Sequence, residues 1–135
     1  VGKWMIRQVE SIVSSRAQRA YRYDVGFSQT PGIQIPPRQL TTRNVFLLYM
    51  VFAKNRDALL DHCLKNGVEA KIHYPIPLYQ QAALAHLDYK KGDFPVTDRH
   101  ASECISFPVD QHLSDAEQNY VIETVKSFYK DKCNG

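Results

Sequence analysis

Apolar residues recur at helical spacing over residues 4–25, and Gly26 follows them. Apolar positions that repeat every three or four residues lie on one side of a helix, so this stretch is predicted to be an amphipathic helix. Its first residues, Trp4-Met5-Ile6, are apolar on more than one side, so we expect another surface to cover that end. The predicted apolar face consists of Met5, Val9, Ile12, Val13, Ala17, Ala20 and Tyr21.

A connector, residues 28–44, leads to the uninterrupted apolar run Val45–Ala53. The run is rich in aromatic and branched residues and has no polar alternation, which favours a central strand buried on both faces. Asn55 can then cap a helix, and Asn66-Gly67 can end it in a left-handed turn.

Apolar and polar residues alternate from Val68 to His73, which indicates a second strand. A strand, a helix and a strand in this order favour a right-handed parallel crossover, with room for another strand between the two. Pro75 has no backbone N–H, so the ladder is expected to end there. Val68, Ala70 and Ile72 are predicted to face one way, and Glu69, Lys71 and His73 the other.

The last part of the chain alternates short helical and extended patterns. Residues 78–88 are predicted to form a short helix, and Thr97 is expected to cap another that runs to about Glu103. Residues 104–109 alternate as a short third strand, and Ser114-Asp115-Ala116-Glu117 is a capping box that starts the final helix. We therefore predict an α/β (α+β) fold, a small two-layer domain with a three- to four-stranded sheet and helices packed on it.

Composition narrows the class of protein. The 135 residues are 44% hydrophobic and carry a formal net charge of +3, which suits one globular domain and is too mild to indicate nucleic-acid binding. Lys3, Arg7, Arg16, Arg19 and Arg22 are read as a solvated helix face. No apolar run is long enough for a membrane span, and the three cysteines form no C-x-x-C, so we expect free thiols in the cytoplasm.

Several kinds of chemistry have no support in the sequence. The glycines form no phosphate or dinucleotide loop, no G-x-S-x-G is present, and the histidines lack the spacing of a metal pair. His73 and Tyr74 are the better candidates, because they end a predicted strand, and ligands tend to bind at strand ends in α/β sheets. The alternative is structural: His73 bonds a neighbouring strand, and Tyr74 packs against a helix.

The order of motifs resembles one known family. The chain resembles the C-terminal domain of the DegT/DnrJ/EryC1/StrS family in three motifs: IHYPIPLYQQ (72–81), the GDFP turn (92–95) and the capping box. The segments before them, RAQRAYRYDVGF, P-G-I and N-x-F-x-L-Y, are similar to that family in the same order. Members are pyridoxal-phosphate-dependent aminotransferases acting on nucleotide-linked keto sugars in amino-sugar biosynthesis. The resemblance covers nearly the whole chain. Two departures bear on substrate identity, because Leu47 and Tyr79 stand where the family often has histidines.

The resemblance implies a domain that works together with another part of a longer polypeptide. Residues 1–135 would be the small C-terminal domain, with 1–27 as the linking helix and 44–131 as the sheet-and-helix body. The Schiff-base lysine would lie in an N-terminal domain that this sequence lacks, so we expect pyridoxal phosphate in the parent, none bound here, no metal, and no activity of the isolated chain. The implied substrate-binding residues are His73, Tyr74, Tyr79 and Gln81.

The implied partners are the N-terminal cofactor domain, a nucleotide sugar and, in the parent, a second subunit, with self-association of the isolated chain. The sequence begins with Val-Gly-Lys, which leaves other interpretations open. One is a free-standing ligand-binding or regulatory domain derived from the family. Another is a structural partner of a separately encoded catalytic chain.

Overall fold

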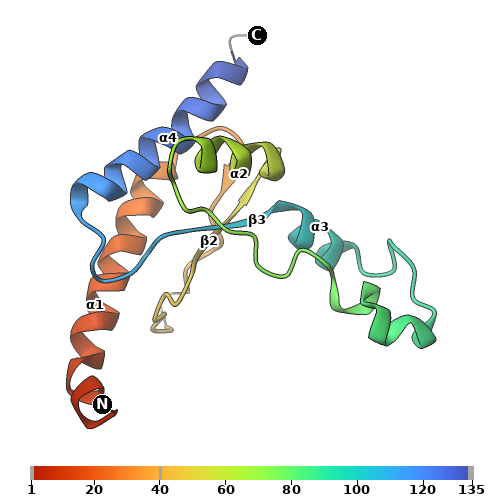
Figure 1. Ribbon diagram of the computed structural model, residues 1–135, viewed down its shortest axis with the longest axis horizontal. Helices are drawn as coiled ribbons and strands as arrows, with labels where there is room; N and C mark the ends of the chain where they lie inside the picture. The colour runs from red at the N-terminus through yellow and green to blue at the C-terminus, as the bar shows by residue number, and fades with distance from the viewer. Residues whose placement is uncertain (1, 40, 134–135) are drawn as a thin grey trace.

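The computed structural model describes residues 2–39 and 41–133, without the side chains of Met5 and residues 131–133. The prediction that places Met5 on a helix face concerns a side chain outside this part. Within it, none of the helices has the length and apolar content that a membrane crossing requires. In chain order the elements are α1 (Gly2–Phe27), β1 (Ile33–Gln34), β2 (Tyr49–Ala53), α2 (Arg56–Lys65), the 3₁₀ helices η1 (Leu78–Gln80) and η2 (Ala82–Leu87), α3 (Pro95–Glu103), β3 (Cys104–Phe107) and α4 (Asp115–Cys133) (Figure 1).

The sheet has three strands in the order β1-β2-β3, and both pairs are antiparallel. The predicted central position of β2 and the mixed helix-and-sheet class are therefore confirmed. Tyr49 lies opposite Phe107 and Val51 opposite Ile105, so these four buried side chains share one face of the sheet. On the other face, the ring of Phe52 lies 4.7 Å from the His100 ring of α3, which covers that side only in part.

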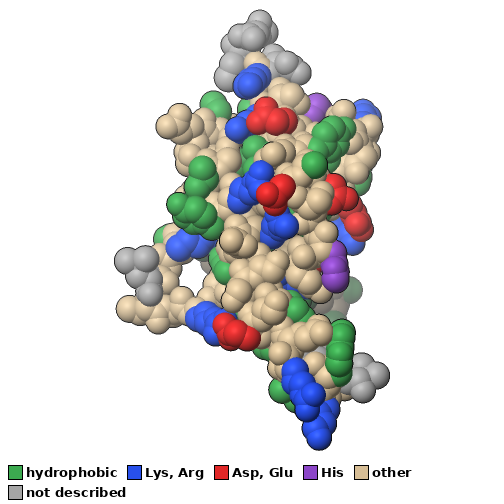
Figure 2. All heavy atoms as spheres, turned by 90° about the vertical axis from the view of Figure 1, so that its left-hand side faces the viewer, with side chains coloured by type: hydrophobic (Ala, Val, Ile, Leu, Met, Phe, Trp, Pro, Cys, Tyr) green, Lys and Arg blue, Asp and Glu red, His purple; other side chains and the backbone are tan. Residues whose placement is uncertain are grey.

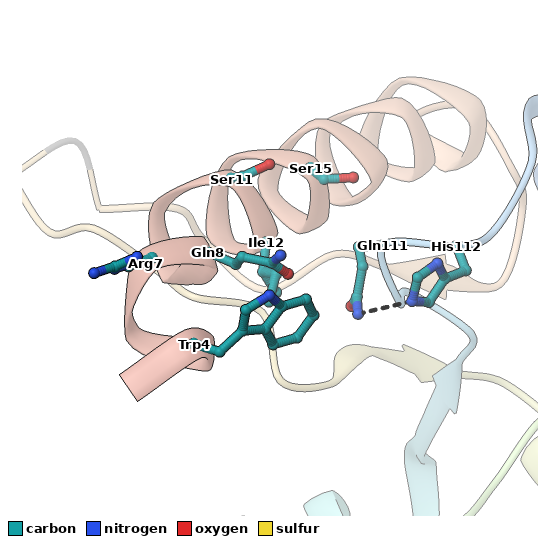
Figure 3. Close-up of a pocket in the computed structure, with 8 residues that line it drawn as sticks. All are labelled: Trp4, Arg7, Gln8, Ser11, Ile12, Ser15, Gln111 and His112. Carbon is teal, nitrogen blue, oxygen red and sulfur yellow. Dashed lines mark hydrogen bonds between the residues drawn. The ribbon is translucent and has the colours of Figure 1, made fainter. Parts of the chain in front are cut away.

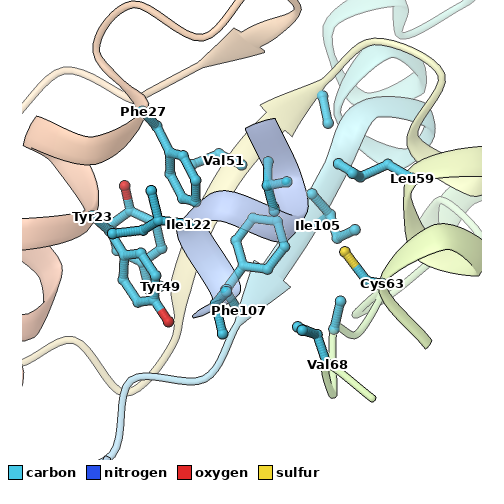
Figure 4. Close-up of a cluster of buried hydrophobic side chains, with 14 of the residues drawn as sticks. Tyr23, Phe27, Tyr49, Val51, Leu59, Cys63, Val68, Ile105, Phe107 and Ile122 are labelled. Carbon is cyan, nitrogen blue, oxygen red and sulfur yellow. The ribbon is translucent and has the colours of Figure 1, made fainter. Parts of the chain in front are cut away.

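Helices α1, α2 and α4 form the layer that supplies most of the core (Figure 4). Tyr23 and Phe27 of α1 stack on each other at 5.5 Å, and Tyr23 stacks on Tyr49 at 4.7 Å. Burying one such ring stabilises a fold by roughly 1.5–3 kcal/mol, and helix propensity contributes far less per residue. Helix α1, which was predicted to link two domains, thus also contributes side chains to the core. α2 adds Leu59 and Cys63, and α4 adds Val121, Ile122, Val125, Phe128 and Tyr129.

The prediction of one long strand over residues 45–53 is wrong for its first four residues. Val45, Leu47 and Leu48 are exposed, and β2 begins only at Tyr49. The backbone N–H of Phe46 donates to the Asn44 side chain at 2.9 Å, and Phe46 has a φ of 46°. A positive φ does not fit an extended strand, so a local turn replaces the predicted pairing.

The predicted second strand is reduced to a single bridge. Lys71 and Ser106 exchange two backbone hydrogen bonds, of 3.0 and 2.8 Å, and no other residue of 68–74 pairs. The bridge is antiparallel to β3, as β2 is, so this segment and β2 run in the same direction with β3 between them. The prediction of a parallel pair separated by another strand is therefore confirmed in direction, although the second member is not a full strand.

Residues 74–94 form an arm that extends from the body in Figure 1 and carries η1 and η2. These two 3₁₀ helices occupy the position of the single short helix predicted for 78–88. The expectation that Thr97 caps α3 is wrong, because α3 begins at Pro95, whose missing N–H costs nothing in a first turn. The capping box of α4 is confirmed: Ser114 donates its backbone N–H to Glu117, and Glu117 donates its N–H to the Ser114 hydroxyl.

Candidate functional site

His73 lines a groove of about 250 Å³ where α1, the turn before β2, the bridged segment and the end of β3 come together. Arg16 approaches from α1, and Leu47 and Leu48 from the turn. Glu69 and Lys71 lie on the same side of the chain as His73, as the alternation predicts, and they also border the groove. The end of β3 and the residues after it complete the wall of the groove, with Ser106, Phe107, Pro108, Val109 and Asp110.

Arg16 joins the groove's separate segments. Its Nη1 donates to the carbonyl oxygens of Phe46 and Leu47 at 3.4 and 3.5 Å, while its Nε and Nη2 each donate to Gln111 Oε1 at 3.4 Å. The carbonyls that a longer β2 would offer to a neighbouring strand therefore bond to this guanidinium. Sequence reasoning placed Arg16 on a solvated helix face, and no local pattern separates it from the other arginines of α1.

The His73 imidazole is half-buried and has no side-chain hydrogen-bond partner among the described residues. Half-buried ring nitrogens ordinarily bond a protein group or a ligand, so this ring is available to a ligand that enters the groove. Beside it, the Lys71 ammonium pairs with the Glu69 carboxylate at 2.6 Å. The groove therefore presents one unengaged imidazole between groups that are already paired.

Two aromatic residues next to the groove have strained backbones. Phe46 precedes Leu47, and Tyr74 follows His73; their φ angles are 46° and 56°. Asn55 and Asp88 also have positive φ, but Asn and Asp tolerate this region, whereas bulky residues seldom adopt it. Strain of this kind collects at functional sites, which favours a role for the two segments that border the groove.

The other predicted site residues lie outside the groove lining. The Tyr74 side chain is 86% exposed. The Tyr79 hydroxyl donates to Asp98 and accepts from Gln80, so it ties η1 to α3. Desolvation, and then the bond to Asp98, raise the pKa of Tyr79. Gln81 is exposed and precedes η2 on the arm. Of the four predicted residues, the structure thus brings only His73 into the groove.

The described side chains show whether this chain could hold a metal ion or attach pyridoxal phosphate covalently. In the part of the chain that the structure describes, no group of three histidines, cysteines or carboxylates is arranged to hold a metal ion. A Schiff-base lysine needs an enclosed site that lowers its pKa. Lys71 is exposed and paired with Glu69, Lys126 pairs with Glu123, and the remaining described lysines are exposed. The described residues therefore do not fit covalent attachment of pyridoxal phosphate.

The cysteines give no nucleophile either. Burial raises the pKa of the Cys63 thiol to about 11, and Cys63 packs in the core. Burial also raises the pKa of Cys104, which is half-buried. Both thiols therefore stay protonated near neutral pH.

Comparison with known proteins gives a consistent result. A sequence model of the DegT/DnrJ/EryC1/StrS aminotransferase family matches residues 1–126. The chain is 32% identical over 122 residues to the erythromycin biosynthesis sensory transduction protein EryC1 of Saccharopolyspora erythraea, covering 90% of this chain and 33% of that protein. It is 32% identical over 107 residues to the UDP-2-acetamido-2-deoxy-3-oxo-D-glucuronate aminotransferase of Pseudomonas aeruginosa, covering 79% and 29%.

Among solved structures, the chain is similar to Streptomyces venezuelae DesV in complex with a ketimine intermediate. The TM-score is 0.91 at 26% identity, with 95% of this chain and 34% of DesV covered. The chain thus spans about a third of the length of the relatives that it matches.

Proposed function

Because the chain belongs to the DegT/DnrJ/EryC1/StrS aminotransferase family, we propose that it is the C-terminal domain of a pyridoxal-phosphate-dependent enzyme that transaminates nucleotide-linked keto sugars. In this proposal the domain closes over cofactor and substrate, and the groove at His73 faces the substrate. The Pseudomonas relative is named as an aminotransferase of a UDP-linked sugar, which supports the substrate class. The coverage of about a third of each relative supports the assignment to one domain of a longer enzyme.

The observation that carries the proposal is the uneven distribution of exposed apolar side chains. Three segments together form what we call the open face: the N-terminal end of α1, the turn before β2, and the arm. Helices α2 and α4 lie at the top of Figure 1, and these segments lie below them. Large apolar side chains that stay exposed in such numbers mark surfaces that another body covers. The residues are Trp4, Ile6, Val9, Val45, Leu47, Leu48, Tyr74, Ile76, Leu78, Leu87, Tyr89 and Phe94.

His73 lies between the segments of the open face, so a body that covers this face would enclose its groove. Within that enclosure, the imidazole would hydrogen-bond a hydroxyl or phosphate group of the sugar nucleotide, and Tyr74 would lie beside it. Tyr79 and Gln81 would act through the arm. Excluding water strengthens such hydrogen bonds, because the local dielectric constant falls.

Pyridoxal phosphate supplies electron withdrawal from the amino carbon when it is bound. The described lysines do not fit its covalent attachment, so the proposal places that lysine in another part of the enzyme. This chain's own contribution is to bind and orient the sugar. The unpaired cysteines support a reducing, cytoplasmic location for the whole enzyme.

The test is a kinetic comparison in the full-length enzyme. Replacing His73 by Ala should lower kcat/KM for the nucleotide-sugar substrate by about tenfold, since a hydrogen bond to a charged group is typically worth ~1.5–3 kcal/mol. The effect on kcat/KM for the amino donor alone should be small. His86→Ala, on the exposed part of the arm, is the matched control. Unchanged kinetics in the His73 variant, or an equal loss in both variants, would contradict the proposed role.

A further inference from the structure

Two of the three segments of the open face are supported in different ways. The start of α1 continues without a break into the half of the helix that packs in the core. Figure 3 shows Trp4 and Arg7 on its first turns, and the loop residues Gln111 and His112 nearby, joined by a hydrogen bond of 3.1 Å. In Figure 2 this start of α1 is the lower tip of the molecule, where basic side chains gather. The rest of the helix holds this segment in place.

The arm, residues 74–94, has no such continuous support. Its two 3₁₀ helices are only three and six residues long. Among the described residues, one side chain accepts every hydrogen bond between the arm and the rest of the chain, apart from the backbone bond that begins α3. That side chain is Asp98, which is half-buried in the first turn of α3. The position of the arm therefore depends on one carboxylate.

Both oxygens of the Asp98 carboxylate bind the arm. Oδ1 accepts from the Tyr79 hydroxyl and, at 3.2 Å, from the side-chain amide of Gln80, and both donors belong to η1. Oδ2 accepts from the backbone N–H of Gly92 at 2.9 Å. Hydrogen bonds to a carboxylate are about twice as strong as those between neutral groups. Asp98 thus joins the early part of the arm and its last turn at a single point.

The GDFP turn, residues 92–95, supplies two of the contacts that fasten the arm. Gly92 has a φ of 102°, a backbone conformation that favours glycine, and in this conformation its N–H points at Asp98. The ring of Phe94 lies 4.9 Å from the ring of Tyr79, the residue whose hydroxyl donates to the same carboxylate. The turn therefore contributes one hydrogen-bond donor and one aromatic contact to the attachment.

Helix α3, which carries Asp98, is itself held against the sheet. The His100 ring lies 4.7 Å from the ring of Phe52 on β2. The Arg99 guanidinium donates to the side-chain oxygen of Gln34 on β1 at 2.6 Å. Asp98 is therefore fixed relative to two strands, and its hydrogen bonds fix the arm relative to the same strands.

We propose that Asp98 is a positioning residue for the proposed transamination: it holds the arm in place beside the groove of His73. The arm begins directly after His73 and carries Tyr79 and Gln81, so holding it prepares this side of the site before the substrate arrives. The Tyr79 hydroxyl donates to Asp98, so Tyr79 acts through the position of the arm. The inference rests on the proposed function and deepens it, because each substrate molecule would have to order a loose arm, and this ordering weakens binding.

The test compares variants of the full-length enzyme. Asp98→Ala should raise KM for the nucleotide sugar about fivefold or more and leave kcat within about twofold, because saturating substrate still orders the arm. Tyr79→Phe removes only the hydroxyl and should raise KM in the same direction. Glu103→Ala is the matched control, since this carboxylate lies at the other end of α3 and pairs with Arg99, and its KM should not change.

Two further measurements show whether the arm is what Asp98 positions. Because Asp98 and Tyr79 bind each other, the double variant should have the KM of Asp98→Ala alone. Lys90 and Lys91 are exposed residues of the arm. Trypsin should therefore cut after them faster in Asp98→Ala than in Glu103→Ala.

The outcomes separate this inference from the proposed function. An unchanged KM in Asp98→Ala overturns the inference, as does a fall in kcat at unchanged KM, which is the result that a poorly folded variant gives. If Asp98→Ala does not fold, Tyr79→Phe decides, and an unchanged KM overturns the inference. Each of these results leaves the proposed function standing if His73→Ala still lowers kcat/KM. Faster cleavage of the arm in Asp98→Ala, with no transamination of nucleotide sugars by the unaltered enzyme, would overturn the proposed function and leave Asp98 as the attachment of the arm.

Discussion

At the scale of single residues, Gly32 and Gly67 show two different reasons for glycine. Both have a positive φ, of 84° and 73°. A Cβ at Gly32 would lie 2.5 Å from a ring carbon of Tyr129, whereas a Cβ at Gly67 would meet nothing within 4 Å. Tyr129 cannot move easily, because it packs in the core and its hydroxyl donates to the Lys54 carbonyl at 2.8 Å. Position 32 therefore combines backbone strain with steric overlap.

The two glycines give a matched prediction. Gly67→Ala should lower the free energy of unfolding by about 1 kcal/mol, the usual cost of left-handed backbone in a residue with a Cβ. Gly32→Ala should cost more than about 2 kcal/mol, because Tyr129 must also be displaced from the core. Urea denaturation of the two variants measures both values. Equal losses would show that the Tyr129 contact adds nothing.

At the scale of elements, ion pairs hold the first turn of α4 against α1. Asp115 pairs with both Arg19 and Arg22, the latter at 2.8 Å. The hydrogen bonds from Arg19, and then Arg22, lower the pKa of Asp115. The bonds from Ser114 likewise lower the pKa of Glu117, and both carboxylates lie at the positive end of the helix dipole. The contact between these two helices should therefore depend on pH.

The direction of this pH dependence follows from the lowered pKa of Asp115. The carboxylate adds stability above its unfolded pKa of about 3.9, and this stability is lost as the pH falls through the lower folded value. Asp115→Asn should therefore lower Tm near neutral pH, and the difference from the wild-type chain should vanish near pH 2. Thermal melts over this range provide the measurement. A difference that stays constant with pH would show that Asp115 acts by packing, not by charge.

Elements differ in how well their sequence signals predicted them. The capping box, the Asn66-Gly67 helix end and the strand predicted over 104–109 act through neighbouring residues. The first two appear as predicted, and the strand is shorter than predicted, Cys104–Phe107, because it ends before Pro108. The run before Tyr49 looked like a strand from its composition. Its backbone instead bonds to Asn44 and to Arg16, 30 residues away. A contact at that sequence distance leaves no periodic pattern, so the sequence could not indicate it.

At the scale of the whole molecule, the helix layer and the open face have opposite characters. The core lies between the sheet and helices α1, α2 and α4, and the side of α2 and α4 away from it is mostly polar. The open face keeps large apolar side chains in water, with Ile6 at 74% and Leu47 at 73% exposure. Large apolar side chains that stay exposed in this way favour association with another surface.

This asymmetry predicts that the isolated chain self-associates. Sedimentation equilibrium should show a mass that rises with protein concentration, because the open face is buried between copies. Ile6→Gln combined with Leu47→Gln should shift the chain toward the monomer. Leu64→Gln, an exposed leucine on α2 outside the open face, is the control and should change little. A chain that stays monomeric at high concentration would count against an uncovered interface.

The sequence by itself determined the features that depend on local chemistry and on periodicity. These are the long first helix, the central place of β2, the capped last helix, the mixed fold class and the resemblance that pointed to the family. It also selected His73, because strand alternation and a following proline are both readable along the chain. Only the tertiary structure decided which residues join His73, since Arg16, Leu47 and Asp110 come from three distant segments. Grooves form between elements, and their walls are set by packing geometry that no single stretch of sequence contains.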